Sequence, residues 1–455
     1  MEEREILEGQ RAYFRSGATR GLGFRREQLR KLLRGLGDWE PALLEALAAD
    51  LGKSPFEAYA TELGVVRGEI RAALGHLKGW ARTKRVPGPL TQFPSGGRLM
   101  AEPKGCVLIL APWNYPVQLI LAPLVSAIAA GNCAVLVLPE DAPRTSGVLA
   151  EMLERLYPPE YVAVRRASVE GNTRLLDLGF DHIFFTGSPR VGRIVMAAAA
   201  KNLTPVTLEL GGKSPCIVDR TADIPLAARR IVWGKCLNAG QTCVAPDYVL
   251  VQEPVREAFL RELRRQAEVL FPGGMLASGD YPQIVNRRHF DRLAGLLDGE
   301  RVLFGGEADP EGQKLALTVL DAPGPERPVM KEEIFGPILP VIPYGEIGEV
   351  LDFVLERPKP LALYLFTRDR EVSRRVLGEL SFGGGCLNDT IVHLLPHNLP
   401  FGGVGESGMG GCHGKAGFDT FTHWKPVLKR GTWLDLPVRY PPYRGKLGLL
   451  KKLMK

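Results

Sequence analysis

Cysteine is scarce in this chain of 455 residues. The seven cysteines form no CxxC pair and no zinc-finger spacing, and an odd number scattered over so long a chain is not a disulfide framework. The acidic N-terminus, MEEREILEGQ, also lacks the apolar segment that a signal peptide needs. We therefore expect a protein of a reducing compartment, the cytoplasm.

A broad excess of positive charge is absent too. The net charge is +7, but residues 425–455 hold nine Lys or Arg against one acid, which leaves −1 for residues 1–424. A near-neutral body lacks the cationic surface that phosphate backbones require, so nucleic acid is excluded as a partner. The basic charge belongs to the C-terminal end of the chain.

Unbroken apolar runs of membrane-spanning length are also missing. Residues 105–139 contain no charge in 35 positions, but prolines at 112, 116 and 123 interrupt them, together with three amide side chains. In hydrocarbon these polar groups would have no partners. This segment instead predicts a strand, a loop, a helix and a second strand, all buried in protein.

The sequence that is present has the composition of a folded protein, 45% hydrophobic and 24% charged, and its length suggests two or three domains. Hydrophobic spacing predicts helices over residues 24–36 and 57–80, and the Pro- and Gly-rich residues 83–103 predict an extended arm. Short apolar strands then alternate with helices, which is typical of a buried, mainly parallel α/β sheet. Similar runs after residue 300 predict a second α/β domain.

Two motifs lie in turns that follow predicted strands. In APWNYP (111–116), Asn114 could donate its side-chain NH2 to a developing oxyanion, or it could be a plain turn asparagine between two prolines. In FFTGSPRVG (184–192), Ser188 fits a helix N-cap and Pro189 the first helical position. Free N–H groups at that helix start could hold a diphosphate, but a simple strand-to-helix turn has the same pattern.

Three further motifs carry reactive or charged side chains. Glu209 in LELGGKSP (208–215) lies in an apolar strand, where burial raises the pKa of a carboxyl group toward that of a general base, unless backbone N–H groups satisfy it. Cys243 in GQTCVAP (240–246) has small neighbours that admit a substrate, although most cysteines of this kind are inert. In KEEIFGP (331–337), Glu333 could bind ribose hydroxyls and Phe335 a flat cofactor, or the segment could be a solvated acidic turn.

No metal site is predicted. His393 and His397 have an i,i+4 spacing, but Pro396 lies between them and no third ligand is evident.

Six motifs together, in this order over nearly the whole chain, resemble the aldehyde dehydrogenase superfamily: PWNYP, FTGS, ELGGKSP, GQTC, EIFGP and LPFGGVGESGMG. Longer runs such as GQTCVAPDYVL and KPLALYLF resemble its class 3, or fatty-aldehyde, branch. The resemblance implies an α/β fold with a Rossmann-like cofactor-binding domain, a second α/β catalytic domain and a small oligomerisation arm. The implied ranges are 1–82 and 104–211 for the NAD-binding domain, 212–401 for the catalytic domain, 83–103 and 417–440 for the arm, and 441–455 for the basic tail.

The resemblance also implies a mechanism. Cys243 adds to an aldehyde, hydride transfer to a nicotinamide leaves a thioester, and Glu209 activates the water that releases the acid. Asn114 and the Cys243 backbone N–H form the oxyanion hole. The implied cofactor contacts are Gly187, Ser188, Pro189, Arg190, Val191 and Gly192 at the diphosphate, Glu333 at the nicotinamide ribose and Phe335 beside the ring.

One departure from the family pattern bears on the cofactor. Where relatives have K-P-S-E, this chain has Leu138, Pro139, Glu140 and Asp141. The lysine that reaches the adenosine ribose in relatives is therefore missing, and two acids lie beside its position. We expect NAD to be favoured over NADP, with Arg144 as a candidate for compensation.

Two rival functions are weighed against this one. A relative that passes the thioester to coenzyme A, or to phosphate, has no use for a water-activating Glu209. A dehydrogenase-like protein that only binds or fills a structural role would not need Asn114, Cys243 and Glu333 in place.

Class 3 resemblance and the frequency of isologous dimers predict a homodimer, with the arm and the segment after Gly417 as interface candidates. The tail places Leu447, Leu450, Leu453 and Met454 on one helical side and Lys451, Lys452 and Lys455 on the other. Such a segment is too short to span a membrane. It can pack on the partner subunit or fray, or it can make a weak contact with an anionic membrane surface.

Overall fold

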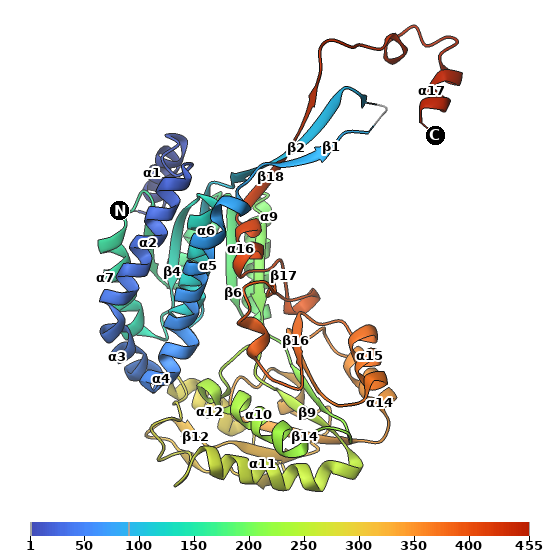
Figure 1. Cartoon of the computed structure of the whole chain (residues 1–455). Helices are drawn as coiled ribbons and strands as arrows, with labels where there is room; N and C mark the ends of the chain where they lie inside the picture. Colours follow the sequence, from blue (N-terminus) through green and yellow to red (C-terminus); the bar gives the residue numbers. More distant parts are fainter. Residues whose placement is uncertain (1, 90–91, 455) are drawn as a thin grey trace.

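The structure is a computed structural model that describes residues 2–89 and 92–454, and the described part contains two large sheets and two small ones (Figure 1). The first large sheet has six strands in the order β17-β7-β6-β3-β4-β5. Its parallel strands are β3 (Cys106–Leu110), β4 (Cys133–Leu138), β5 (Val162–Arg166), β6 (His182–Gly187) and β7 (Val206–Leu210). The short β17 (Gly408–Met409) returns from late in the sequence to pair antiparallel with β7.

The second large sheet has seven strands in the order β10-β13-β14-β9-β8-β15-β16. Their bounds are β8 (Pro215–Val218), β9 (Tyr248–Gln252), β10 (Val302–Phe304), β13 (Thr318–Asp321), β14 (Ile338–Tyr344), β15 (Ala362–Phe366) and β16 (Gly384–Leu387). All neighbouring pairs except β10 with β13 are parallel. A two-stranded ribbon, β11 (Ala308–Asp309) and β12 (Lys314–Leu315), lies apart from it. The two predicted α/β units are therefore present as two sheets.

Helices occupy most of the remaining chain. In Figure 1 the blue helices α1, α2 and α3 lie at the left of the molecule, and α10, α11 and α12 lie in its lower part with the second sheet. The helices before β8 are α1 (Glu3–Arg15), α2 (Leu22–Asp38), α3 (Glu40–Leu51), α4 (Pro55–Ala58), α5 (Gly64–Trp80), α6 (Gln118–Ala130), α7 (Pro143–Leu156), α8 (Val169–Asp177) and α9 (Pro189–Lys201). Those after it are α10 (Ile224–Cys236), α11 (Arg256–Leu270), α12 (Arg287–Gly295), α13 (Pro328–Lys331), α14 (Ile347–Leu355), α15 (Arg370–Glu379), α16 (Gly414–Thr420) and α17 (Leu447–Leu453).

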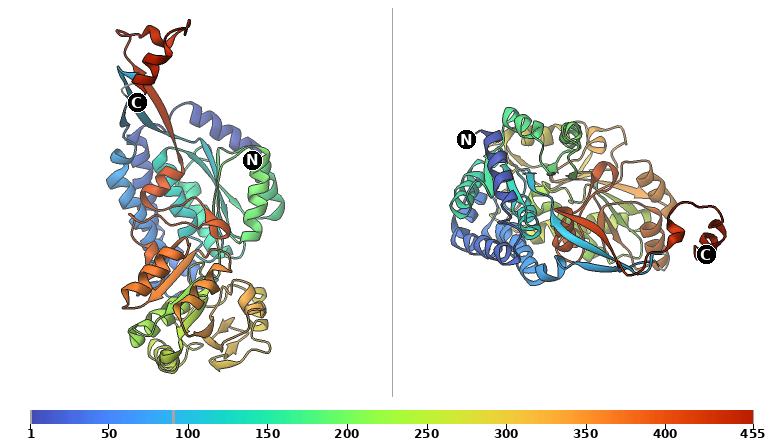
Figure 2. Two further views of the ribbon diagram at one scale, coloured as in Figure 1. Left: turned by 90° about the vertical axis from the view of Figure 1, so that its right-hand side faces the viewer. Right: turned by 90° about the horizontal axis from the view of Figure 1, so that it is seen from above.

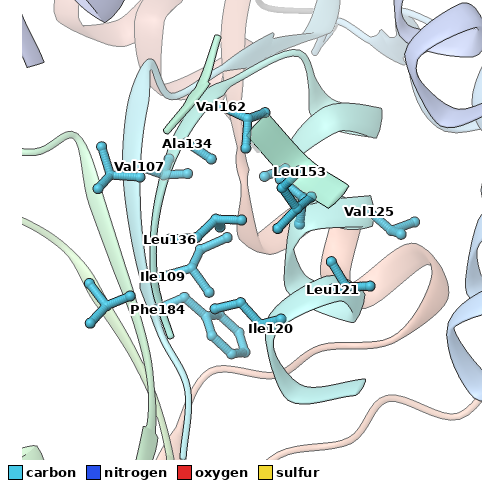
Figure 3. Packing of buried hydrophobic residues seen from close by; sticks show 14 of the residues in the cluster. Val107, Ile109, Ile120, Leu121, Val125, Ala134, Leu136, Leu153, Val162 and Phe184 are labelled. Carbon is cyan, nitrogen blue, oxygen red and sulfur yellow. The ribbon is translucent and has the colours of Figure 1, made fainter. Parts of the chain in front are cut away.

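The core of the first sheet explains why its strands are continuously apolar. Every residue of β3 and β4 is buried, because helices cover the sheet and leave no solvated face. Figure 3 shows Ile120 of α6 on the side of the helix that faces Ile109 and Leu136 of the strands. The uncharged segment 105–139 is thus strand, loop, helix and strand inside the protein, as predicted.

The predicted N-terminal helices are confirmed with one local difference. In α2, Leu29, Leu32 and Leu36 are fully buried, as their spacing predicted. The predicted helix over 57–80 is instead α4, a π-helical turn (Tyr59–Leu63) and α5. A π turn inserts an extra residue into a helix and is frequent at functional sites.

The predicted arm is an antiparallel three-stranded sheet that extends from the body (Figure 2). Its strands are β1 (Lys84–Pro87), β2 (Ser95–Pro103) and β18 (Thr422–Arg430), and β18 pairs with β2 along its whole length. Residues 90–91 of the predicted arm lie outside the described part. Residues 417–420 are the end of α16, where Phe418 is fully buried, so the arm strand begins later than Gly417. How the chain divides into domains stays a prediction.

The C-terminal tail continues past the arm, away from both large sheets (Figure 1). Within it, Leu447 and Leu450 of α17 and Met454 directly after this helix are exposed by 62, 43 and 72%, so the described chain does not cover these apolar side chains. Lys455 and the side chain of Leu453 lie outside the described part. Among the described residues, no helix has the length and apolar character needed to cross a membrane.

Candidate active site

A mostly apolar cavity of about 510 Å³ is lined by residues from the regions of both large sheets. Glu209 on β7 and Cys243 before β9 both face it. At its rim Phe56, Trp233 and Leu395 keep 83, 39 and 50% of their surface exposed, so the approach is apolar as well. Other apolar lining residues include Leu119, Leu237, Val244, Leu270, Phe271, Ile391, Val392, Leu394 and Phe401.

Cys243 lies in the loop that follows α10 and a tight 3-10 turn (Leu237–Gly240). Asn238 and Ala239 in this turn have φ of 52° and 51°, left-handed values that residues other than glycine rarely adopt. The Gln241 side chain holds the turn by donating to the carbonyls of Asn238 and Gln283, both at 3.0 Å. This bracing fixes the loop two residues before the cysteine.

The surroundings of Cys243 favour its neutral thiol. Burial raises the pKa of Cys243 to about 12, and the nearby carboxylates of Glu333 and Glu209 act in the same direction. A thiol with so high a pKa is protonated at neutral pH, so it has to lose its proton as it reacts.

Glu209 is a buried carboxyl group without a hydrogen-bond partner for either oxygen among the described residues. Burial raises the pKa of Glu209 well above the ordinary value, and the neighbouring Cys412 thiol only partly opposes this. The predicted alternative, an acid satisfied by backbone N–H groups, is therefore wrong. A carboxyl group kept free in an apolar cavity is suited to accept a proton from a bound molecule.

Asn114 is placed next to the cysteine loop, although it is not among the residues that line either cavity. Its side-chain Nδ2 donates to the Gln241 carbonyl at 3.0 Å, and Oδ1 has no partner among the described residues. An amide nitrogen carries two hydrogens, so one remains for another acceptor. The neighbouring Tyr115 reaches the same loop, since its hydroxyl lies 2.6 Å from the Thr242 Oγ1.

A buried ion pair holds the segment that carries Asn114 and Tyr115. Lys53 Nζ lies 2.6 Å from Glu62 Oε1, and both side chains are fully inaccessible. The other oxygen of Glu62, in the π turn, accepts the backbone N–H groups of Val117 and Gln118 at 2.8 and 3.1 Å. Lys53 also donates to the Asn114 carbonyl at 3.1 Å and lies 4.1 Å from the Tyr115 ring centroid. One ion pair thus fixes both ends of the loop.

A second cavity, of about 240 Å³, adjoins the first where β7 ends. Leu210 lines the first cavity, while the next two residues, Gly211 and Gly212, line the second. A Cβ on Gly211 would lie 2.0 Å from Glu333 Oε2, so only glycine leaves room for that carboxyl group. Glu333 also faces this cavity; burial raises its pKa to about 8, and its Oε1 has no partner among the described residues.

Of the glycine-turn residues, Pro189 at the start of α9 lines the second cavity. The predicted helix cap is present, because the Ser188 Oγ accepts the Val191 N–H at 3.4 Å. Gly192 is buried against Leu210, where a Cβ would lie 2.7 Å from that side chain, while Gly187 is half-buried and Arg190 is exposed. This cavity fits a dinucleotide. The start of α9 and the cations Lys331 and Lys359 suit a diphosphate, and the unpartnered Glu333 oxygen suits a ribose hydroxyl.

Phe335 and Leu138 lie outside both cavity linings. The Phe335 ring packs edge-on against Trp113, with centroids 5.5 Å apart. Leu138 is fully buried, whereas Glu140 is exposed and Asp141 accepts from Asn286 at 2.9 Å.

Several residues near the cavities carried no recognisable signal in the sequence. Lys53 and Glu62 are brought together only by folding, and so is Glu57, which lines the first cavity and accepts the Asn238 N–H at 2.8 Å. Burial raises the pKa of Glu57 to about 7. The π turn between Glu57 and Glu62 has no sequence signature that distinguishes it from an ordinary helix.

The two histidines with i,i+4 spacing have separate contacts. His393 Nδ1 lies 3.7 Å from the Cys386 Sγ, and His397 Nδ1 lies 3.0 Å from Glu69 Oε1. Among the described residues, no group of three His, Cys, Asp or Glu side chains is arranged to hold a metal ion.

Comparison with known proteins gives consistent matches over nearly the whole chain. Residues 4–427 match the aldehyde dehydrogenase family. The chain is similar to the 4,4'-diaponeurosporen-aldehyde dehydrogenase of Staphylococcus aureus, with 46% identity over 98% of this chain and 97% of that protein. It is also similar to aldehyde dehydrogenase family 3 member A2 of Mus musculus, with 45% identity over 97% of this chain and 91% of that protein.

Solved structures agree with these matches. The structure described as the substrate-bound state of Staphylococcus aureus AldH is similar to this chain with a TM-score of 0.97 and 45% identity, over 99% of both chains. An Escherichia coli NADP-dependent enzyme is similar with a TM-score of 0.86 and 26% identity, over 94% of this chain and 90% of that one.

The buried ion pair generates a prediction about stability. Glu62→Gln leaves the Lys53 ammonium group buried without a counter-charge, so we expect the free energy of unfolding to fall by about 3–5 kcal/mol. Urea unfolding measures this change. Glu27→Gln is the matched control, because its pair with Arg34 is exposed to solvent and should contribute little to stability. Equal losses in the two variants would contradict the structural role of Glu62.

Proposed function

The chain belongs to the aldehyde dehydrogenase family, whose members are NAD(P)-dependent oxidoreductases acting on aldehydes, and we propose that it oxidises a large apolar aldehyde to the carboxylic acid through a thioester on Cys243. The observation that carries this proposal is the pairing of a cysteine thiol with a free, buried carboxyl group in one apolar cavity. A second cavity suited to a dinucleotide adjoins it.

The cavity supports an apolar substrate. Aliphatic and aromatic side chains dominate its lining and rim, although Glu57, Thr61, Gln118, Thr186 and Asp280 also line it. Burial of a long aliphatic chain there contributes about 25 cal/mol per Å² of apolar surface. One relative is described as a 4,4'-diaponeurosporen-aldehyde dehydrogenase, which is consistent with an aldehyde substrate.

The first half of the reaction is addition of Cys243 to the carbonyl carbon. As the S–C bond forms, negative charge develops on the carbonyl oxygen, and the thiol proton must leave the sulfur. We assign the second Asn114 N–H and the Cys243 backbone N–H to that oxygen; one such donor is typically worth about 10² to 10³ in rate. That proton leaves through water in the cavity, so Glu209 is needed as a base only when the thioester is hydrolysed.

Bound NAD supplies the hydride acceptor, and Glu333 together with the start of α9 would hold it. Oxidation leaves an acyl group on Cys243 as a thioester. Glu209 then takes a proton from water, the water oxygen bonds to the acyl carbon, and the C–S bond breaks with its electrons returning to sulfur. The unpaired Glu209 carboxylate thus favours hydrolysis over transfer to coenzyme A, the rival reaction.

The mechanism predicts separate defects for two variants. Glu209→Gln should still form about one NADH per site in a rapid burst, while steady turnover falls by about 10² to 10⁴, because only thioester hydrolysis loses its base. Cys243→Ala should give no burst. Rapid-mixing absorbance with a panel of long aliphatic and aromatic aldehydes measures both.

The pH dependence has a defined sign. Since burial raises the pKa of Glu209, the basic carboxylate form gains population as pH rises, and turnover should climb with pH in the wild type but not in Glu209→Gln. Wild-type turnover in Glu209→Gln, or turnover that requires coenzyme A, would contradict hydrolysis by this residue. No NADH from the wild type with any aldehyde would reject the enzyme proposal itself.

We also propose that NAD is favoured over NADP. At the position where relatives carry a lysine, Leu138 is fully buried and offers no cation to a 2′-phosphate, while the nearby Glu140 is exposed. We expect kcat/KM to be at least about tenfold higher with NAD, the size of one lost charged contact of about 1.4 kcal/mol. Steady-state kinetics with both cofactors tests this, and Arg144→Ala shows whether that exposed cation compensates. Tighter use of NADP would contradict the proposal.

We infer that the protein forms a homodimer in which the arm and tail meet the partner. The edge strand β18 exposes Val427 and Leu428 by 40 and 56%, and Trp433 beyond it is 72% exposed. Together with the uncovered face of α17, these side chains form an apolar surface of the kind that dimers bury.

Removal of residues 444–455 tests what the tail contacts. If the tail packs on the partner, we expect the truncated chain to dissociate at higher protein concentration than the full chain in sedimentation velocity. Sedimentation with anionic and neutral vesicles is the parallel measurement. Vesicle binding by the full chain alone, with an unchanged dimer, would instead assign the tail to a membrane surface.

A further inference from the structure

A second acid–base cluster lies behind the cavity, on the side of α5. Glu69 on α5 is buried and accepts three hydrogen bonds: from His413 Nδ1 at 2.8 Å, His397 Nδ1 at 3.0 Å and the Gly414 N–H at 3.0 Å. Figure 1 shows α16, which begins at Gly414, beside α5. The cluster therefore ties the segment before α16 to this helix.

His413 connects the cluster to the cavity. Its side chain is buried and lines the cavity that also contains Glu209 and Cys243. Glu69 occupies Nδ1, and no hydrogen bond to Nε2 is found among the described residues. Because His413 lines the cavity, Nε2 is the ring nitrogen that remains for a molecule bound there.

The backbone at this point is strained. His413 has φ of 69°, a left-handed value that costs a residue other than glycine about 1–3 kcal/mol. The next residue, Gly414, has φ of 49°, and a Cβ there would lie 2.1 Å from the His397 carbonyl oxygen. Backbone strain of this kind persists where surrounding contacts hold the residue, often at functional sites. Here the hydrogen bonds to Glu69 hold His413 and Gly414.

The proposed reaction needs a group in this position. Each turnover leaves a proton on Glu209, inside a cavity lined mostly by apolar side chains. Glu209 must lose that proton before it can act again. Imidazole is the side chain best suited to accept and release a proton near neutral pH.

We propose that His413, held by Glu69, accepts the proton from Glu209 through cavity water and returns it to solvent. The proton leaves a Glu209 oxygen for water, a proton from that water bonds to Nε2, and the resulting imidazolium is stabilised by the Glu69 carboxylate. When product leaves, Nε2 gives the proton to entering water. No electrons change hands. The inference rests on the proposed function.

The charges around His413 are consistent with this role. Burial acts to raise the pKa of Glu69, but the hydrogen bonds from His413, Gly414 and His397 hold it at about 2, so Glu69 is an anion throughout the working range. The other titratable groups that face this region are His397, His393, Cys412, Glu209 and Cys243.

Pre-steady-state kinetics of His413→Gln tests the relay. We expect the NADH burst to keep its rate and amplitude, while steady turnover falls about tenfold or more and recovers as imidazole buffer is added, because external base replaces the missing nitrogen. Glu69→Gln should move turnover in the same direction by less. His76→Gln is the matched control, since His76 lies on the same helix but is exposed.

Two outcomes would overturn the inference. One is wild-type turnover in His413→Gln at every buffer concentration. The other is an equal loss of burst and turnover that imidazole does not restore, which would indicate a structural role; if His413→Gln fails to fold, Glu69→Gln is judged by the same two readouts. If the wild type forms no NADH, the proposed function itself is contradicted. That result is distinct from the two outcomes that contradict the relay through His413.

Discussion

The buried ion pair between Lys53 and Glu62 is the constraint on which the geometry of the cavity depends. Its members come from the N-terminal helices, yet between them they bind the loop 114–118 at four points. Taking two charges out of water is costly. Removing one partner of such a pair lowers stability strongly, because the other charge then stays buried without a counter-charge. A loop held this way keeps Asn114 against the cysteine loop, where a shift of 1 Å would misplace an oxyanion donor.

In the same cavity, neither carboxyl oxygen of Glu209 has a hydrogen-bond partner among the described residues. A carboxyl group with two unpartnered oxygens in apolar surroundings lowers stability, and the strand β7 that carries it is held from both sides by β6 and β17. The surrounding sheet therefore holds in place a carboxyl group that lowers stability but serves the proposed reaction. Glu69 is the opposite case, since three hydrogen bonds keep it anionic. Two buried carboxyl groups thus receive opposite environments within one site.

Much of this arrangement could be predicted from the sequence. Continuous apolar strands indicated two parallel sheets, and six ordered motifs indicated the aldehyde dehydrogenase family and its class 3 branch, which the relatives confirm. Cys243 and Glu209 were found because short-range motifs carry them, and the fold brings both to one cavity. Lys53, Glu62 and the Glu69–His413 pair were not found, because residues up to 344 positions apart meet only after folding. Phe335 was predicted beside a cofactor ring, and what it contacts in the structure is Trp113.

The central claim is that the aldehyde carbon becomes bonded to Cys243. Mass spectrometry of Glu209→Gln, mixed with NAD and a long-chain aldehyde and quenched in acid, tests it most directly. If Cys243 carries the acyl group, the peptide that contains it gains the mass of that group, and Cys243→Ala shows no such gain. An acyl group on another residue, or NADH formation with no covalent adduct, would contradict it.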